Sequence, residues 1–264
     1  ITSLYKMEIL INNTTNGEIF TTLFQHMKLF TENVNVYFRE DELFIQGMDR
    51  SHVSIFEIKL PKDWFDKYEL STEIILGINT NILFKVLNTR EKTHDIQIKQ
   101  NEENNDKLEI NLLSESKDVV DLHYVIPLIE IDSELMAIPE MNYQAELSLP
   151  SSTFSTLIDQ MKMFGETLNI KCTEEQVQMI SESQDSGKMF VNIPMDDLNS
   201  YAIEEEKELD LSFSIAHLKN ICLYNKIAKE IEINLTDNYP IQLVYHLNGN
   251  IAKAIFYLAP KIDD

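Results

Sequence analysis

The stretch Thr22-Leu-Phe-Gln-His-Met-Lys-Leu-Phe-Thr-Glu-Asn-Val-Asn-Val36 returns later in the chain as Thr156-Leu-Ile-Asp-Gln-Met-Lys-Met-Phe-Gly-Glu-Thr-Leu-Asn-Ile170. A second pair of segments repeats in nearly the same register, with Asp95-Ile-Gln-Ile98 matching Glu230-Ile-Glu-Ile233. Two matches in the same order indicate two copies of one domain, which excludes a solenoid of many short repeats. At the first offset, identical residues include Leu23, Met27, Lys28, Phe30, Glu32 and Asn35, which match Leu157, Met161, Lys162, Phe164, Glu166 and Asn169.

Each copy follows the same order of predicted elements. An amphipathic helix comes first, because apolar residues recur at helical spacing with polar residues opposite. Alternating strands follow, then a second helix, then two more strands. This order predicts an α+β fold with antiparallel sheets and two helices packed on one face of each copy. The expected strands are Val34–Phe38, Leu43–Gly47 and Val53–Leu60 in the first copy, and Leu168–Cys172, Val177–Ser181 and Met189–Ile193 in the second.

The helical stripes define the expected helices. They consist of Ile19, Phe20, Leu23, Phe24 and Met27, then Ile82, Leu83, Val86 and Leu87, in the first copy; and of Phe154, Leu157, Ile158 and Met161, then Leu218, Ile221 and Cys222, in the second.

The repeat places the domain limits at residues 1–126 and 141–264. Residues 127–140 join the copies and mix apolar anchors with acids, which favours an extended linker pinned across a surface. Asn101–Asp106 is expected to form a polar hairpin tip, and Tyr201–Glu208 an acidic loop.

Composition excludes several classes of protein. Two cysteines, Cys172 and Cys222, cannot form a disulfide framework, and a reducing compartment is expected. No run of apolar residues is long enough to span a membrane, and no N-terminal stretch of the given sequence has the charged-then-apolar pattern expected of a secretory signal. The net charge of -22 opposes simple binding to nucleic acid, because DNA is a polyanion.

Several motifs together resemble one family. Gln46-Gly-Met-Asp-Arg-Ser-His-Val-Ser-Ile55 resembles a strand and loop of the proliferating cell nuclear antigen family, the eukaryotic and archaeal DNA sliding clamp. Leu135-Met-Ala-Ile-Pro-Glu140 is similar to the end of that family's interdomain connecting loop, and Leu76-Gly-Ile-Asn79 fits before the second helix. Tyr257-Leu-Ala-Pro-Lys-Ile-Asp-Asp264 is similar to the family's C-terminal signature. The resemblance covers essentially the whole chain.

The resemblance implies a DNA polymerase processivity factor that acts in DNA replication and DNA repair and is not an enzyme. Three subunits would form a closed homotrimeric ring with helices lining a central hole and sheets outside, and no cofactor or metal is needed. Exposed sheet edges would pair between subunits. The expected edges, Val119–Val125 and Lys188–Ile193, give the predicted subunit-interface residues Val119, Val120, Leu122, Tyr124, Met189, Val191 and Ile193.

Partner proteins of the family insert a short peptide under the connecting loop. An adaptable, mostly apolar surface suits such a ligand. Asp49 next to His52 could also form an acid–base pair, although a loop histidine with local hydrogen bonds is expected instead. The implied pocket residues are Met48, His52, Val53, Ile55, Leu135, Ala137, Ile138, Pro139, Pro240, Tyr257, Leu258, Ala259, Pro260 and Lys261.

Cations on the polar helix faces would meet the phosphates of double-stranded DNA, without sequence specificity. Thr21 and Thr22 stand where a pair of lysines is usual in the family, and Asp159 where a basic residue is common. We therefore expect a lining that is less basic than usual and weak, mobile contacts. The candidates are Lys28, Lys85, Arg90, Lys162, Lys219 and Lys226.

Two other readings stay open at this point. The chain could be one subunit of a heterotrimeric checkpoint-type or archaeal clamp. A two-metal nuclease would use the many carboxylates, but no phosphate loop or metal-spaced His/Cys cluster accompanies them. Expected partners are DNA polymerase, other proteins with a clamp-binding motif and a clamp loader, and no membrane. The expected location is the nucleus, or a viral replication site in the cytoplasm, because the Lys-, Asn- and Ile-rich composition is typical of an AT-rich genome.

Overall fold

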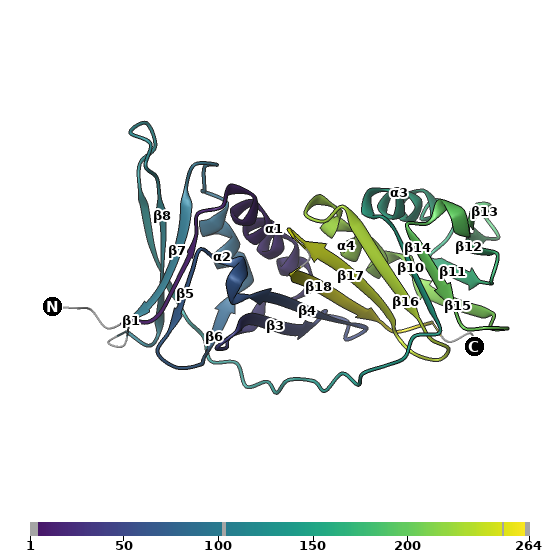
Figure 1. The fold of residues 1–264 in the computed structure, drawn as a ribbon, viewed down its shortest axis with the longest axis horizontal. Coiled ribbons are helices and arrows are strands. Elements are labelled where there is room, and N and C mark those ends of the chain that lie inside the picture. The colour runs from purple at the N-terminus through teal and green to yellow at the C-terminus, as the bar shows by residue number, and fades with distance from the viewer. Residues whose placement is uncertain (1–4, 102–103, 250, 262–264) are drawn as a thin grey trace. The chain divides into compact units, whose positions relative to one another are not determined.

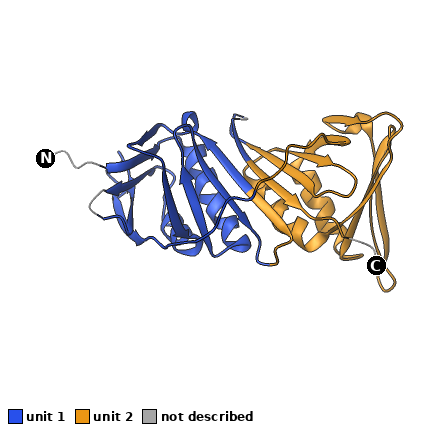
Figure 2. Ribbon diagram, turned by 90° about the horizontal axis from the view of Figure 1, so that it is seen from below, with its two compact units in different colours: residues 1–50, 57–136, 247–253 blue, residues 51–56, 137–246, 254–264 orange. Residues whose placement is uncertain are grey.

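The computed structural model describes residues 5–101, 104–249 and 251–261. The chain divides into two compact units, which are coloured separately in Figure 2. Unit 1 comprises residues 1–50, 57–136 and 247–253, and unit 2 comprises residues 51–56, 137–246 and 254–264. Each unit thus takes short segments from both halves of the sequence.

Unit 1 contains two antiparallel sheets and two α-helices (Figure 1). One sheet has the strand order β5-β1-β7-β8-β9, and the other runs β4-β3-β2-β6. Helices α1 and α2 pack against each other. The elements are β1 (Tyr5–Ile11), α1 (Thr14–Phe30), β2 (Asn33–Phe38), β3 (Glu42–Met48), β4 (Ser54–Pro61), η1 (Lys62–Trp64), β5 (Lys67–Leu70), β6 (Ile74–Asn79), α2 (Thr80–Leu87), β7 (Asp95–Asn101), β8 (Lys107–Leu113) and β9 (Leu122–Pro127).

Unit 2 repeats this plan. Its sheets run β14-β10-β16-β17-β18 and β13-β12-β11-β15, and α3 packs against α4. Strand for strand, the order is that of unit 1, which confirms the duplication. The elements are β10 (Ala145–Pro150), α3 (Ser151–Met161), β11 (Thr167–Cys172), β12 (Gln176–Ser183), β13 (Gly187–Pro194), η2 (Met195–Asp197), β14 (Ser200–Ile203), β15 (Leu209–Ser214), α4 (Ile215–Cys222), η3 (Leu223–Lys226), β16 (Glu230–Leu235), β17 (Ile241–Leu247) and β18 (Ala252–Leu258).

The helices form where the apolar periodicity predicted them. In unit 1 the Asn13 side chain caps α1 by accepting a hydrogen bond from the Asn16 backbone amide. The Asn79 side chain caps α2 by accepting a hydrogen bond from the Ile82 backbone amide. The predicted stripe of α1 is buried, as are Phe154, Ile158 and Met161 of α3. Apolar burial at about 25 cal/mol per Å² therefore holds each helix pair on its sheets.

Several strand predictions were incomplete or wrong. Strands β1, β5 and β6, with their counterparts β10, β14 and β15, were not predicted, and three strands rather than two follow the second helix of each unit. Residues 201–203 belong to β14, which pairs with β10, so the acidic loop begins only at Glu204. Four-residue strands such as β5 and β14 are too short for their alternation to be recognised.

Two further predictions concern chain segments at turns. The edge strand predicted for Val119–Val125 is β9, which begins at Leu122, so Val119 and Val120 lie in the preceding turn. The predicted hairpin tip does connect β7 to β8, although residues 102–103 lie outside the described part. The final residues of the C-terminal signature, 262–264, also lie outside it. In the described residues, no helix is long and apolar enough to cross a membrane.

Both cysteines belong to the core of unit 2. Cys172 and Cys222 are buried and unbridged, and burial raises the pKa of the Cys172 thiol to about 12. Burial also raises the pKa of Cys222. Since the thiolate is the reactive form, both groups should be inert at neutral pH.

We therefore expect neither thiol to react with an aromatic disulfide reagent at pH 8 while the protein is folded. A pH of 8 lies far below the raised pKa of Cys172, so the thiol stays protonated. Absorbance of the released thiolate measures the reaction, and the same protein in denaturant is the control in which both cysteines react. Rapid reaction in the folded state would contradict this placement.

Candidate peptide-binding surface, DNA-facing helices and subunit edges

The segment after β9 runs along strands β6, β2 and β3 of unit 1 and is hydrogen-bonded to a residue of each. The Ile129 amide donates a 2.9 Å hydrogen bond to the Gly77 carbonyl of β6. The Asn35 side-chain amide donates to the Ile131 carbonyl at 3.1 Å and to the Ser133 hydroxyl at 3.1 Å. Residues 129–133 are thus pinned, as the sequence predicted for the linker, and the pinning uses mostly backbone atoms of the segment.

Gly77 permits this close approach. A Cβ at that position would overlap the Ile129 carbonyl oxygen. No movement of a flexible side chain could relieve that overlap, because the obstructing atom is backbone. Glycine is therefore required here for the approach of two backbones rather than for a special dihedral angle.

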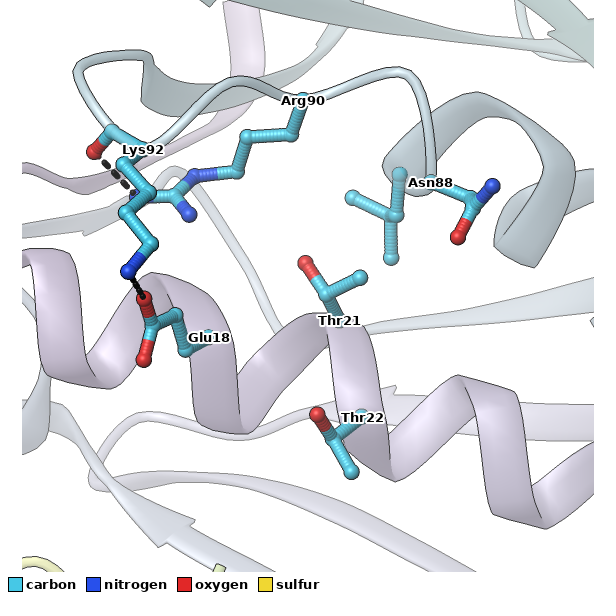
Figure 3. A pocket seen from close by; sticks show the side chains of 7 residues that line it. Glu18, Thr21, Thr22, Asn88, Arg90 and Lys92 are labelled. Atoms are coloured by element: carbon cyan, nitrogen blue, oxygen red, sulfur yellow. Dashed lines mark hydrogen bonds and ion pairs between the residues drawn. The ribbon is translucent and has the colours of Figure 1, made fainter.

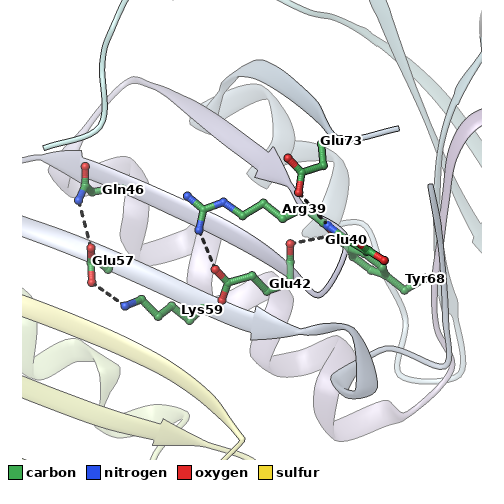
Figure 4. A network of polar contacts seen from close by, with 8 residues as sticks. All are labelled: Arg39, Glu40, Glu42, Gln46, Glu57, Lys59, Tyr68 and Glu73. Carbon is green, nitrogen blue, oxygen red and sulfur yellow. Dashed lines mark hydrogen bonds and ion pairs between the residues drawn. The ribbon is translucent and has the colours of Figure 1, made fainter. Parts of the chain in front are cut away.

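Gln46 holds the far end of the segment. Its Nε2 donates to the Met136 carbonyl at 3.0 Å, and its Oε1 accepts from the Met136 amide at 2.7 Å. The same Nε2 donates to Glu57 Oε1 at 3.1 Å, and Lys59 Nζ lies 3.1 Å from the other Glu57 oxygen (Figure 4). Because Gln46 and Glu57 are both buried, this network satisfies groups that would otherwise be costly to desolvate.

The loop after β3 and the C-terminal strand meet in unit 2. The Ala259 amide donates a 3.2 Å hydrogen bond to the Val53 carbonyl, which joins the two signature segments. Exposed His52 adopts a left-handed backbone with φ 58°. The Ser51 hydroxyl lies 2.9 Å from His217 Nε2, and His217 Nδ1 lies 2.9 Å from the Ser214 hydroxyl. His217 therefore fixes this loop to the start of α4.

The C-terminal segment borders a hollow of about 310 Å³ in unit 2. The Lys261 amide donates to the Ser212 carbonyl at 2.7 Å, and Lys261 Nζ donates to Thr167 Oγ1 at 2.6 Å. Hydrogen bonding to Lys171, and then to Asn169, lowers the pKa of Asp210 at this hollow. The lining residues are Asp210, Leu211, Ser212, Asp237, Asn238, Pro260 and Lys261.

The predicted pocket residues are distributed over both units. Met48 and Leu135 belong to unit 1, and Leu135 is exposed. Leu258 is fully buried in the core of unit 2, and Tyr257 is half-buried with its hydroxyl accepting from Gln242. The remaining predicted residues of unit 2 that reach the surface at least partly are His52, Val53, Ile55, Ala137, Ile138, Pro139, Pro240, Ala259, Pro260 and Lys261.

Residues that build these surfaces were missed in the sequence. Gln46 lies within a recognised motif, yet nothing in the sequence shows that its side-chain amide hydrogen-bonds to the backbone of Met136. Asn35 repeats as Asn169, which is a usable signal, but Asn169 bonds to Asp210 and not to a linker. His217 has no distinguishing pattern, because its partner Ser51 is remote in the chain.

The predicted DNA-facing cations differ in whether their charged groups already contact other residues of the chain. Lys28 Nζ lies 4.0 Å from the centre of the Phe84 ring. Lys219 forms a 2.8 Å ion pair with Asp159, and Arg90 is half-buried and donates to backbone carbonyls. Three lysines of the helices and their caps are exposed and form no ion pair with another described residue: Lys85, Lys162 and Lys226.

Strands β9 and β13, which contain the predicted edges, are the terminal strands of their sheets. β9 pairs with β8 and ends the five-stranded sheet, and β13 pairs with β12 and ends the four-stranded sheet. Register places Leu122 and Tyr124 on the same face as buried Leu112 and Ile110. Met189, Val191 and Ile193 lie on the face of buried Ser181, Met179 and Val177, and all three are half-buried.

The described residues contain no group of three or more His, Cys, Asp or Glu side chains that could hold a metal ion.

Replacing Gln46 with alanine should loosen the linker. The change removes the paired hydrogen bonds to Met136, at roughly 1 kcal/mol each in stability. Hydrogen exchange measured by mass spectrometry should become faster in residues 129–136, and it should stay unchanged in α1. Gln97→Ala, which removes another side-chain amide of unit 1, is the matched control. Unchanged exchange in the linker would contradict the anchoring role of Gln46.

Comparison with known proteins matches both units. Residues 9–135 match the N-terminal domain of the proliferating cell nuclear antigen and residues 137–261 match its C-terminal domain. The chain is 28% identical to proliferating cell nuclear antigen 2 of Drosophila melanogaster over 227 residues, covering 85% of this chain and 87% of the relative. It is 28% identical to the proliferating cell nuclear antigen of Chaetomium thermophilum over 243 residues, covering 90% and 92%.

A solved structure shares the fold. The crystal structure of proliferating cellular nuclear antigen from Entamoeba histolytica superposes with a TM-score of 0.85 at 20% identity, covering 98% of this chain and all of that one. The duplicated α+β units, the joined signature segments and the matches to both family domains lead to one conclusion. The chain belongs to the proliferating cell nuclear antigen family.

Proposed function

We propose that this chain is one subunit of a homotrimeric DNA sliding clamp that encircles duplex DNA and tethers DNA polymerase to it. The observation that carries the proposal is that two copies of the family's domain are present, each with an amphipathic helix pair on its sheets. The proposed role is that of a non-enzymatic processivity factor. The proposed location is the nucleus, in keeping with the word "nuclear" in the name of the Chaetomium thermophilum relative.

Ring closure would use the edges of β9 and β13. Both edges carry half-buried apolar side chains on their inner faces, and unpaired edges favour addition of a strand. Because β9 and β13 are different surfaces, their contact is heterologous, and repetition of one rotation can close a ring. The inner-face side chains would extend each subunit's core across the joint.

Val191→Asp should reduce trimer formation by at least tenfold. The charge would have to be desolvated at the joint, which costs several kcal/mol if it is unpaired. Size-exclusion chromatography with light scattering should give three times the chain mass of 30.7 kDa for the parent protein and one chain mass for the variant. Asn192→Asp, one residue away on the exposed outer face, is the matched control. A parent that is monomeric at all concentrations would contradict the homotrimer and favour the heterotrimeric alternative.

The peptide surface supports the tethering role. The linker is held on unit 1, and the signature loop is bonded to the C-terminal segment in unit 2. We propose that polymerase, repair proteins and a clamp loader dock on the signature loop and C-terminal segment of unit 2 through a short peptide with apolar anchors. The nearby acids Asp210 and Asp237 favour peptides with basic flanking residues.

Ile138→Ala should weaken binding of a clamp-binding-motif peptide by roughly tenfold, because a buried aliphatic contact is lost. Calorimetric titration measures the affinity, and light scattering checks that the oligomer is intact. With a competent loader on primed DNA, the parent should lengthen polymerase products and the variant should not. Val125→Ala, which truncates an exposed apolar side chain of β9, is the control for peptide affinity. Absence of any processivity gain with the parent would refute the tether role.

A further inference from the structure

The dipeptide Asn-Gly occurs twice in the chain, as Asn16-Gly17 and as Asn248-Gly249. In this dipeptide the glycine amide nitrogen can attack the side-chain carbonyl carbon of the asparagine, because glycine has no side chain to hinder the approach. The attack forms a C–N bond that closes a succinimide ring, and the side-chain nitrogen leaves as ammonia. Water then opens the ring to give aspartate or isoaspartate. The two dipeptides lie in different surroundings, which should decide where this reaction takes place.

Asn248 and Gly249 lie in the turn between β17 and β18, and both are exposed. Asn-Gly suits such a turn because glycine tolerates a left-handed backbone, and Gly249 has φ 84°. Apart from its chain neighbours, no described atom lies within 4 Å of the position that a Cβ on Gly249 would take. The peptide group between the two residues is therefore unobstructed and open to water.

Asn16 and Gly17 are buried at the start of α1. The Gly17 amide donates a 2.8 Å hydrogen bond to the Asn13 carbonyl, as part of the helix. Arg90 reaches this part of α1 from the segment after α2 (Figure 3), and a Cβ on Gly17 would come within 2.6 Å of its guanidinium. Ring closure at Asn16 would require the Gly17 nitrogen to leave its helical hydrogen bond. We therefore expect this dipeptide to be protected.

A hydrogen bond joins the two asparagines. Asn248 Nδ2 donates to Asn16 Oδ1 at 2.6 Å, and Asn16 Nδ2 donates to the Trp64 carbonyl at 2.9 Å. Residues 247–253 belong to unit 1, so the bond attaches this turn to α1 within one unit. It also supplies a donor to the side-chain oxygen of buried Asn16, which would be costly to leave without one.

Deamidation of Asn248 would remove this attachment. The product has a carboxylate in place of the amide, and a carboxylate has no hydrogen to donate to Asn16 Oδ1. Asn16 cannot rotate to offer its own nitrogen without losing the bond to the Trp64 carbonyl. Isoaspartate also adds a methylene carbon to the backbone, which changes the path of the turn.

We propose that Asn248 is a site of spontaneous deamidation, and that the reaction releases the β17–β18 turn from the start of α1. The reaction consumes water and needs no enzyme or cofactor. Because Asn16 is protected, the protein loses the contact at one defined residue as it ages. The inference concerns the chain itself and does not depend on DNA or on a partner protein.

The test is peptide mapping by mass spectrometry after the folded protein has been incubated for weeks at physiological temperature and pH. The peptide that contains Asn248 should progressively gain the mass expected when an amide becomes a carboxyl group, and an isoaspartyl methyltransferase should methylate it. The peptide that contains Asn16 should stay unmodified. In denatured protein both peptides should react. An Asn248 peptide that stays unmodified in the folded protein, while the denatured protein reacts, would overturn the proposal.

Gly249→Asn is the matched variant for the chemistry. Asparagine tolerates the left-handed backbone at this position, while its Cβ hinders attack by the amide nitrogen. Deamidation of Asn248 should therefore be several-fold slower in the variant than in the parent. Equal rates in the two proteins would show that the succinimide route is not used.

Asn248→Asp imitates one product and tests the structural consequence. Hydrogen exchange in residues 14–18 of α1 should become faster, and the Tm should fall by about 2–4 °C. Asn104→Asp is the control, because it adds the same charge at an exposed asparagine between β7 and β8, and it should change neither quantity. If Asn248→Asp leaves exchange at the start of α1 as it is in the parent, the release of the turn is wrong.

Discussion

The structure depends on how each amphipathic helix pair is buried against its sheets. In unit 1, α1 places Phe20, Leu23 and Phe24 in the core, and in unit 2 the shorter α3 does the same with Phe154 and Ile158. Burial of one face of a helix fixes the orientation of the opposite face as well. The side chains proposed to meet DNA are therefore positioned by the apolar stripe behind them, and a change in that stripe would rotate the cations.

The sequence predicted this part of the fold because its signal is periodic and local. The stripes of α1 and α3 are recurring apolar residues, and duplication supplies two independent examples of each pattern. The short strands β5 and β14 escaped prediction because four residues contain too little alternation, and their existence depends on pairing with β1 and β10. The start of β9 was wrong because Val119 and Val120 have high strand propensity but lie in a turn, where the Val120 carbonyl meets buried His94.

The candidate sites show a similar division. The peptide surface could be found because its segments resemble those of a family, whereas Gln46, His217 and Asp210 act through partners that only folding brings near. The number of lysines could be read from the sequence, but not which of them are paired with a carboxylate in the fold. Asp159 neutralises Lys219 and Glu18 faces Lys92, so the effective charge of the helix faces is lower than the number of lysines indicates. In a chain of net charge -22, such pairing leaves few cations to oppose the acids.

Gly77 has a consequence for how the family can diverge. The linker is attached there by backbone atoms, from the Ile129 amide to the Gly77 carbonyl, and Gln46 likewise contacts only the backbone of Met136. Apart from Ser133, whose hydroxyl accepts from Asn35, the side chains of the linker take no part in these anchoring hydrogen bonds and can change without removing them. Substitutions in this segment can change which ligands it prefers while its path stays constant. The path itself depends on Gly77 and Gln46 in the sheet. A short linker can in this way acquire new partners at little cost to the fold that carries it.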